Sequence, residues 1–474
     1  MTVTEPGEPG PGIDGEYLGK RTLRTGTAGW VLLAGLGVGY VISGDYSGWN
    51  FGLAEGGFGG LAVAAVVIAA MYGAMVLSMA EMSAALPTAG GGYTFARRAL
   101  GPWGGFATGT AVLIEYSIAP AAIATFIGAY VESLGLFGIV DGWWVYLAVY
   151  ALFVGIHLAG VGEALKAMFV VTAIALVGLV IFAVASIGSF SWSNLTDIAP
   201  DPEAAGASEF LPFGYLGIWS ALPFAIWFFL AIEGVPLAAE EARDPARNVP
   251  RGIIAAMAVL VVTGAVVLIL VPGAAGAAAM QASGNPLVEA LGSGTAATVV
   301  NYIGLAGLVA SFFSIIYAYS RQLFALSRAG YLPRGLSITN ARNVPAAALI
   351  VPGVIGFVLS IFGNGATLLN MAVFGAALSY VLMMISHIVL RLREPGMERP
   401  YRTPGGLVTA GFALVIAVLS VFATFLVDST AAFGCLVVFA LFMIYFGLYS
   451  RTRLVAGSPD EEFAALAAAE DELR

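Results

Sequence analysis

The sequence predicts an all-α membrane protein, and composition is the first reason. Of its 474 residues, 59% are hydrophobic and 10% are charged, and the mean hydropathy is +0.91. Soluble globular domains carry about 25% charged residues. Apolar runs of about 20 residues recur along nearly the whole chain, and each is long enough to cross a hydrocarbon core about 30 Å thick. The runs do not alternate as barrel strands do, so we expect helices.

Two of the predicted spans are interrupted, and their positions predict the architecture. We place twelve spans at residues 28–53, 58–85, 103–134, 142–160, 163–188, 213–240, 250–272, 297–327, 346–363, 367–392, 407–427 and 430–450. Span 1 contains GLGVGYVISGDYSGWNFG and span 6 contains ALPFAIWFFLAIEGVPLAAEE. Because an offset of five spans reverses the direction of crossing, we expect a five-plus-five inverted repeat with broken helices 1 and 6. Paired interruptions mark the binding sites of secondary transporters.

Positive charges predict the orientation of these spans. If both termini are cytoplasmic, all 20 Lys and Arg residues fall on the cytoplasmic side, as the positive-inside rule requires. The predicted outer loops carry Asp and Glu but no Lys or Arg. The expected organisation is a disordered cytoplasmic tail at 1–27, a first transmembrane repeat at 28–190, an extracellular loop at 191–212, a second repeat at 213–395, helices 11 and 12 at 396–451 and a cytoplasmic tail at 452–474.

Four acidic residues are predicted at membrane depth. A carboxylate in the hydrocarbon layer costs several kcal/mol, so each one needs a partner or a function. Asp45 lies about 15 residues into span 1, which is about 22 Å along a helix. Glu233 lies in the interruption of span 6, and Glu115 lies near the middle of span 3. Glu81 comes close to the cytoplasmic end of span 2, where we expect a local structural role.

Asp45 and Glu233 occupy comparable places in the two broken spans. Each break is expected to expose the N-terminus of a following half-helix, whose free N–H groups favour negative charge. In carriers of amino acids the substrate carboxylate can fill that place, whereas here the protein supplies its own carboxylates. We therefore expect a site for an amine without a carboxylate, held by the two acids and by unwound backbone carbonyls. The alternative is that both acids only cap the broken helices.

Other polar and aromatic residues are candidates for the same site. Glu115 contacts substrate, carries a coupling proton or braces neighbouring helices, and the sequence leaves these three roles open. The aromatic rings before the second break are suited to bind a cation or to gate access to the site. The alternative is that they serve only in packing. The serines of span 8 suit an ion or substrate site, or else a helix contact. The predicted substrate-binding residues are Ser43, Gly44, Asp45, Glu115, Trp227, Phe228, Phe229, Glu233, Gly234, Ser311 and Ser314.

Motifs of soluble enzymes are weak or absent. PTAGGGY at 87–93 lacks the Lys-Ser/Thr ending of a phosphate-binding loop, so we expect a flexible connector. His157 and His387 are isolated in the sequence and make a poor metal site. The chain has one cysteine, Cys435, which excludes an intrachain disulfide. We expect no catalytic residue, no metal, no cofactor and no nucleic-acid partner.

Several segments resemble the amino acid/polyamine/organocation transporter superfamily. They are AEMSAALPTAGGGYTFARRALGPWGGF at 80–106, AAEEARDPARNVPRGI at 238–253 and SRQLFALSRAGYLP at 320–333. Within the superfamily, VISGDYSGWNFGL at 41–53, LIEYSIAPAAIATFIGAYVE at 113–132 and WFFLAIEGVPLAAEEARDPARNVPRGI at 227–253 resemble the ethanolamine permease family. The resemblance covers about residues 25–450. It implies uptake of ethanolamine across the bacterial inner membrane, and an inverted-repeat fold with spans 11 and 12 outside the repeat.

The chain departs from the wider superfamily at two positions. Where a Gly-Ser/Thr-Gly pattern often binds the carboxylate of an amino acid, this chain reads ISG at 42–44, followed by Asp45. This departure favours an amine over an amino acid. Where some proton-coupled relatives carry a lysine in span 5, this chain has Ala175. The choice of coupling ion, proton or sodium, therefore stays open.

The leading hypothesis is a secondary transporter, not an enzyme, that imports ethanolamine or a related small amine by alternating access. Its expected partners are this substrate, membrane lipid and a coupling ion. An amino acid or polyamine permease of the same superfamily is the alternative, and a polyamine also suits acidic residues. A membrane sensor would need a signalling domain, for which the predicted tails are too short. An intramembrane enzyme would need a nucleophile with a base, or a metal cluster.

Overall fold

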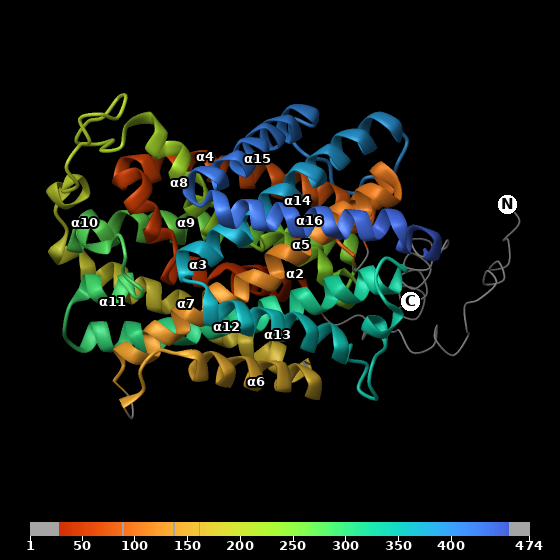
Figure 1. Cartoon of the computed structure of the whole chain (residues 1–474), viewed down its shortest axis with the longest axis horizontal. Helices are drawn as coiled ribbons and strands as arrows, with labels where there is room; N and C mark the ends of the chain where they lie inside the picture. The colour runs from red at the N-terminus through yellow and green to blue at the C-terminus, as the bar shows by residue number, and fades with distance from the viewer. Residues whose placement is uncertain (1–27, 88–89, 136–137, 161, 455–474) are drawn as a thin grey trace, which may run out of the picture.

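Helices that run mainly along the long axis of the molecule make up most of the part of the chain that the structure describes (Figure 1). The computed structural model describes residues 28–87, 90–135, 138–160 and 162–454. No β-strand occurs among these residues, although Ala28 and Ala242 form a parallel backbone bridge. The predicted all-α fold is therefore confirmed for the part of the chain that the structure describes. The predicted tails lie outside it, apart from residues 452–454.

The long apolar helices lie close to the predicted spans. They are α4 Gly52–Ala85, α5 Gly92–Ser133, α6 Trp143–Ala159, α7 Gly162–Ser186, α9 Pro245–Ala275, α12 Thr295–Arg328, α13 Ala346–Phe362, α14 Gly365–Arg393, α15 Leu407–Val427 and α16 Ser429–Leu448. The two interrupted regions are divided into α2 Trp30–Val41, α3 Ser43–Tyr46 and η1 Trp49–Phe51, and into α8 Gly214–Trp227 and η5 Ile232–Glu241. A long helix suits a membrane because it satisfies its backbone N–H and C=O groups internally.

The surface of the helices identifies the chain as a multi-pass membrane protein. Among the described residues, nine helices are long and apolar enough to cross a membrane. Three shorter apolar helices accompany them, at Trp30–Tyr46, Trp143–Ala159 and Ala346–Phe362. Large apolar side chains also point outward, such as Phe422, which is 65% exposed, and Leu448, which is 85% exposed. Surfaces of this kind are stable against lipid and unfavourable in water.

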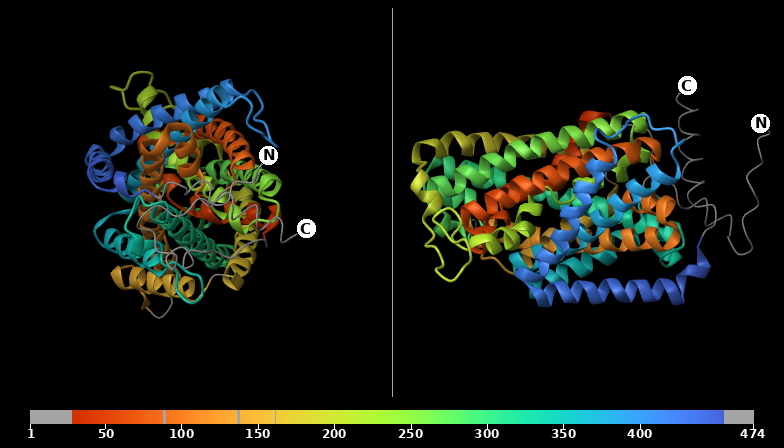
Figure 2. Two further views of the ribbon diagram at one scale, coloured as in Figure 1. Left: turned by 90° about the vertical axis from the view of Figure 1, so that its right-hand side faces the viewer. Right: turned by 90° about the horizontal axis from the view of Figure 1, so that it is seen from above.

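Helix α5 is the centre of the bundle. In its most apolar stretch 94% is buried, compared with 17% for α16. It packs against α6, α12, α13, α14 and α16. Figure 2 shows α16, in dark blue, along the outer edge of the bundle. A polar side chain on α5 is therefore shielded from lipid, which bears directly on Glu115.

The structure corrects several predicted boundaries. The third span was expected to begin at residue 103, but α5 begins at Gly92 and turns at Gly101, whose φ is 76°. The predicted connector at 87–93 is thus partly helical, and its residues 88–89 lie outside the described chain. Short helices absent from the prediction occupy the loops: η3 Ile187–Ser189, η4 Trp192–Thr196, α10 Ala277–Met280, α11 Pro286–Leu291, η6 Arg334–Ser337 and η7 Ser450–Arg453. Their apolar runs are too short for a periodic signal.

Candidate functional site

The first interruption lies slightly later in the chain than expected. Ile42 keeps helical dihedrals between α2 and α3, and the helix ends at Ser47, which is extended with φ −164° and ψ 161°. Gly48 follows with φ 99°, in the left-handed region that favours glycine. The segment that carries Asp45, α3, has only 4 residues. Because Ile42 is helical, α3 continues α2, and Asp45 lies at the C-terminal end of the first half-helix and not at the N-terminus of the second, as the sequence had predicted. The expected favourable helix dipole therefore does not act on this carboxyl group.

The second interruption separates α8 from η5. Helix α8 ends at Trp227, and η5 begins at Ile232 after a turn. Ala231 has φ 77°, a conformation that is uncommon for a residue other than glycine and that costs about 1–3 kcal/mol. Glu233 lies in the first turn of η5, as the sequence predicted. The strained turn sets the direction in which the Glu233 carboxyl group points.

The two interruptions are packed directly against each other. A Cβ atom added at Gly44 would lie 2.4 Å from the backbone oxygen of Trp227, so only glycine allows this approach. The indole Nε1 of Trp227 donates a hydrogen bond to the backbone oxygen of Ser47 at 2.9 Å. The ring of Phe228 stacks on Trp49 with a centroid distance of 5.4 Å. Gly44, Trp227 and Phe228, all predicted for the site, therefore lie at one junction.

Asp45 is fully buried and points toward α9. Its side chain is 0% exposed, and neither carboxyl oxygen accepts a hydrogen bond of normal geometry from the described residues. A Cβ atom added at Gly264 of α9 would lie 3.8 Å from Asp45 Oδ1. Thr263 is the neighbouring polar residue on the same helix. The carboxyl group expected to face Glu233 thus lies against α9.

Glu233 lies among tyrosine side chains from three helices. Tyr116 Oη of α5 donates to Glu233 Oε1 at 2.9 Å, and Tyr380 Oη of α14 donates to Oε2 at 3.0 Å. Tyr72 Oη of α4 donates to Tyr380 Oη at 2.8 Å. Gly234 leaves room for this arrangement, because a Cβ atom there would lie 3.0 Å from Tyr116 Oη. Both oxygens of Glu233 are therefore held in place.

The carboxyl group that lies against Glu233 is that of Glu115. The two side chains are 0% and 3% exposed, and each carboxyl group is near enough to the other to affect its ionisation. The backbone amide of Ala231 is also near the Glu115 carboxyl. Neither oxygen of Glu115 accepts a hydrogen bond of normal geometry from a donor in the described chain. The structure thus brings together two of the acids predicted for the site, as a pair that the sequence did not predict.

The remaining predicted residues surround this centre. The Ser311 hydroxyl of α12 forms a hydrogen bond with the Ser43 hydroxyl, with an Oγ–Oγ distance of 2.8 Å. Ser311 also donates to the backbone oxygen of Tyr40 at 2.6 Å. Ser314 donates to its own helix, at the Ala310 oxygen. Phe229 packs on Tyr72 with a centroid distance of 5.3 Å. Ser43 and Ser311 therefore join the first interruption to α12, whereas the hydroxyl of Ser314 is used locally.

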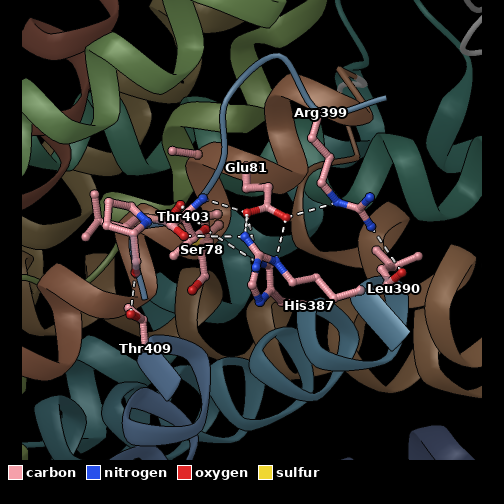
Figure 3. Close-up of polar contacts among 12 residues, drawn as sticks. Ser78, Glu81, His387, Leu390, Arg399, Thr403 and Thr409 are labelled. Carbon is pink, nitrogen blue, oxygen red and sulfur yellow. Dashed lines mark hydrogen bonds and ion pairs between the residues drawn. The ribbon is translucent and has the colours of Figure 1, made fainter. Parts of the chain in front are cut away.

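Glu81 lies in a separate cluster, shown in Figure 3. Its carboxyl group accepts from Arg391 at 2.9 and 2.5 Å and from the Thr403 amide at 2.6 Å. Arg399 lies 3.0 Å away, and His387 Nε2 lies 3.5 Å away. The cluster ties α4 to α14 and to the connection that leads into α15. These contacts brace the three segments against one another.

A cavity of about 440 Å³ opens near the interruptions. Its lining includes Glu55 of α4, Phe224 of α8, Gln281, Asn364 and Asp428. Both acidic residues lie in predicted outer regions. The volume is within the range of small-molecule pockets, about 300–1,000 Å³.

The tyrosine partners of Glu233 are residues of the candidate site that the sequence did not predict. Tyr116 is adjacent to a predicted acid, but Tyr380 is separated from Glu233 by 147 positions. A tyrosine in an apolar helix carries no signal that distinguishes a site residue from packing. Among the described residues, no group of three or more His, Cys, Asp or Glu side chains is placed to hold a metal ion. Chemically, the arrangement is suited to hold a cation or protons.

Comparison with known proteins shows that the chain is similar to transporters. An uncharacterized transporter of Rhizobium meliloti (strain 1021) is 28% identical over 436 residues, covering 88% of this chain and 91% of its own. The branched-chain amino acid permease BcaP of Lactococcus lactis subsp. cremoris (strain MG1363) is 27% identical, covering 73% and 77%. The methylthioribose transporter of Bacillus subtilis (strain 168) is 27% identical, covering 78% and 82%. The sequence profile of amino acid permeases matches residues 31–453, and the chain therefore belongs to the amino acid permease family.

Proposed function

We propose that the protein is a secondary transporter that imports ethanolamine, or a closely related small amine, across the bacterial inner membrane. The observation that carries this proposal is the set of buried acids Asp45, Glu115 and Glu233 beside the two interruptions. Among the described residues, no Arg, Lys or His forms an ion pair with any of them. Buried carboxylates are stable only when paired, so the site is suited to a cationic ligand.

Glu233 and Glu115 are the proposed ammonium ligands. An ammonium group has three donors, and the two unoccupied oxygens of Glu115 are acceptors beside it. The hydroxyl of ethanolamine would bond to backbone carbonyls or to serines such as Ser43. Asp45 lies farther along the first interruption and keeps the local potential negative. The aromatic rings of Phe228 and Phe229 supply apolar walls, on which a cation is also stabilised.

An amino acid permease is the second candidate, because one of the relatives reported above and the family itself bear that name. BcaP is named for branched-chain amino acids, and the family as a whole is that of amino acid permeases. An amino acid brings a carboxylate that would lie close to Asp45 at the first interruption. Like charges at short range in a buried site cost several kcal/mol. The acidic site therefore favours an amine.

Alternating access is the proposed mechanism. The twelve apolar helices would form two inverted repeats of five, followed by α15 and α16, with both termini in the cytoplasm. In that arrangement the two interruptions lie at the repeat interface, where transporters bind substrate. The hydrogen bond from Tyr116 to Glu233 joins α5 of the first repeat to η5 of the second, and movement of one repeat against the other would break it. The bond from Tyr380 of α14 to Glu233 lies within the second repeat and would be kept.

Uptake into proteoliposomes tests the proposal. The purified chain is expected to accumulate labelled ethanolamine, and unlabelled ethanolamine should compete better than leucine, alanine or putrescine. Glu233→Gln is expected to lower uptake at least tenfold, because the neutral amide cannot balance an ammonium charge. Glu209→Gln, in an exposed loop, is the matched control and should transport normally. Competition by leucine with none by ethanolamine would replace this proposal by the second candidate.

A further inference from the structure

Two buried carboxyl groups in contact are unstable when both are ionised. Glu233 already accepts one tyrosine hydrogen bond on each oxygen. Glu115 lies against it, 0% exposed, with neither oxygen accepting a hydrogen bond of normal geometry from the described residues. Two carboxylates can only accept, so their contact is repulsive until one of them carries a proton. A single proton between them turns the contact into a strong, charge-assisted hydrogen bond.

The groups that face the Glu115–Glu233 pair supply no positive charge that could replace this proton. They are four tyrosines from four helices, namely Tyr40 of α2, Tyr72 of α4, Tyr116 of α5 and Tyr380 of α14. None of these phenols carries a positive charge. Among the described residues, no cationic side chain forms an ion pair with Glu115 or Glu233. The pair therefore needs either a proton or a cation from outside the protein.

We propose that Glu115 and Glu233 share one proton in the empty transporter, and that the ammonium group of the amine replaces this proton when it binds. The inference rests on the proposed function, because it takes the ligand to be an amine. It assigns to Glu115 a role in the exchange of the proton for substrate, one of the roles that the sequence left open.

The exchange balances in atoms and in charge. The empty pair is one carboxylic acid and one carboxylate, with a net charge of −1. The occupied pair is two carboxylates and one ammonium, also with a net charge of −1, and the displaced proton passes to water. A buried site that keeps its net charge avoids the large cost of changing charge in a medium of low dielectric constant. A complete cycle exchanges one ammonium ion for one proton, so it is electroneutral, and the amine enters while its own inward concentration gradient exceeds that of the protons.

Proton release on binding is the direct test. Purified full-length protein is titrated with ethanolamine by calorimetry, at one pH, in phosphate and in MOPS, whose ionisation enthalpies differ and which contain no primary amine. We expect about one proton released per amine bound. The apparent affinity should rise about tenfold per pH unit while the empty pair holds its proton, as linkage requires. Glu115→Gln should release no proton, and its affinity should no longer change with pH, because Glu233 alone then carries the charge.

The possible outcomes separate the two proposals. If the wild-type protein binds ethanolamine without releasing a proton, the shared proton is wrong and the proposed function stands. If it does not bind ethanolamine, the proposed function is wrong and this inference fails with it. Should Asp45→Asn abolish proton release while Glu115→Gln retains it, the proton belongs to Asp45 and the inference is also overturned. The wild-type titration alone decides the first two outcomes, whether or not a variant folds, and Glu209→Gln serves as the control.

Discussion

Glu233 shows how a buried carboxyl group can be held in place by neutral donors. Its two oxygens accept from Tyr116 and Tyr380 at 2.9 and 3.0 Å. Hydrogen bonds to a charged acceptor contribute about 1.5–3 kcal/mol each, which offsets part of the cost of burying the carboxyl group. The tyrosines fix its position and add no positive charge. The carboxyl group therefore keeps its attraction for a cation.

Removal of one tyrosine hydroxyl tests this arrangement. We expect Tyr380→Phe to weaken ethanolamine binding about tenfold, which is about 1.4 kcal/mol, because Glu233 loses a donor and the hydroxyl of Tyr72 loses its acceptor. The measurement is the Kd by calorimetry. Tyr319→Phe is the matched control, since its hydroxyl donates to the Leu349 oxygen in a buried contact between α12 and α13. Equal losses in both variants would mean that the effect on binding is general and not specific to Glu233.

The elements around the site are joined by polar contacts as well as by apolar packing. Gly44 and Trp227 bring the two interruptions into contact, and Ser311 ties the first interruption to α12. At some distance from these, Glu81 joins α4 to α14 and to the connection before α15, with side-chain exposure of 2% for Glu81 and 8% for Arg399. Because these charges are buried, loss of one partner leaves the others without compensation.

Neutralising Glu81 is expected to destabilise the packing of these helices. Glu81→Gln should lower the free energy of unfolding by about 3 kcal/mol, since arginines remain partly buried without a counter-charge. Thermal unfolding in detergent measures the change. Arg98→Ala is the control, because its ion pair with Glu394 has side-chain exposures of 51% and 31% and should contribute only about 0–1 kcal/mol. Similar shifts for the two variants would show that the Glu81 cluster contributes no more than an exposed pair.

At the scale of the whole molecule, the distribution of charge decides how the bundle lies in the membrane. The connection that holds Glu203 is acidic, and the connection that holds Arg342 is basic. Positively charged connections stay in the cytoplasm, so the two should lie on opposite sides of the membrane. The buried acids of the site lie between these two ends of the helices, where they face neither solution directly.

Cysteine labelling in intact cells tests the orientation. Glu203→Cys is expected to react with a membrane-impermeant maleimide, whereas Arg342→Cys should react only after permeabilisation. The wild-type chain is a suitable background, because its one cysteine, Cys435, is 2% exposed. Labelling of both variants from outside, or of Arg342→Cys alone, would contradict the proposed topology.

The sequence by itself determined the class of this protein and the placement of most helices. Continuous apolar runs specify membrane helices locally, since each helix satisfies its own backbone groups. An acidic residue in an apolar run is costly in free energy. For that reason Asp45, Glu115 and Glu233 could be predicted from the sequence as acids inside the membrane-spanning region. Glycine and proline also marked the two interruptions, because they disturb helices through local geometry alone.

Only the tertiary structure decided which of these acids meet. Asp45 lies against α9, and Glu115 lies against Glu233, although the sequence predicted a site formed by Asp45 and Glu233 and left the role of Glu115 open. Tyr116 and Tyr380 donate to Glu233 from two different helices, and Tyr72 donates to Tyr380 from a third, and no local pattern records such contacts. The direction of a side chain depends on where its helix ends and on how the helix is rotated against its neighbours. Those quantities are set by packing across the whole bundle, which is why the pair of carboxyl groups could be found only in the folded structure.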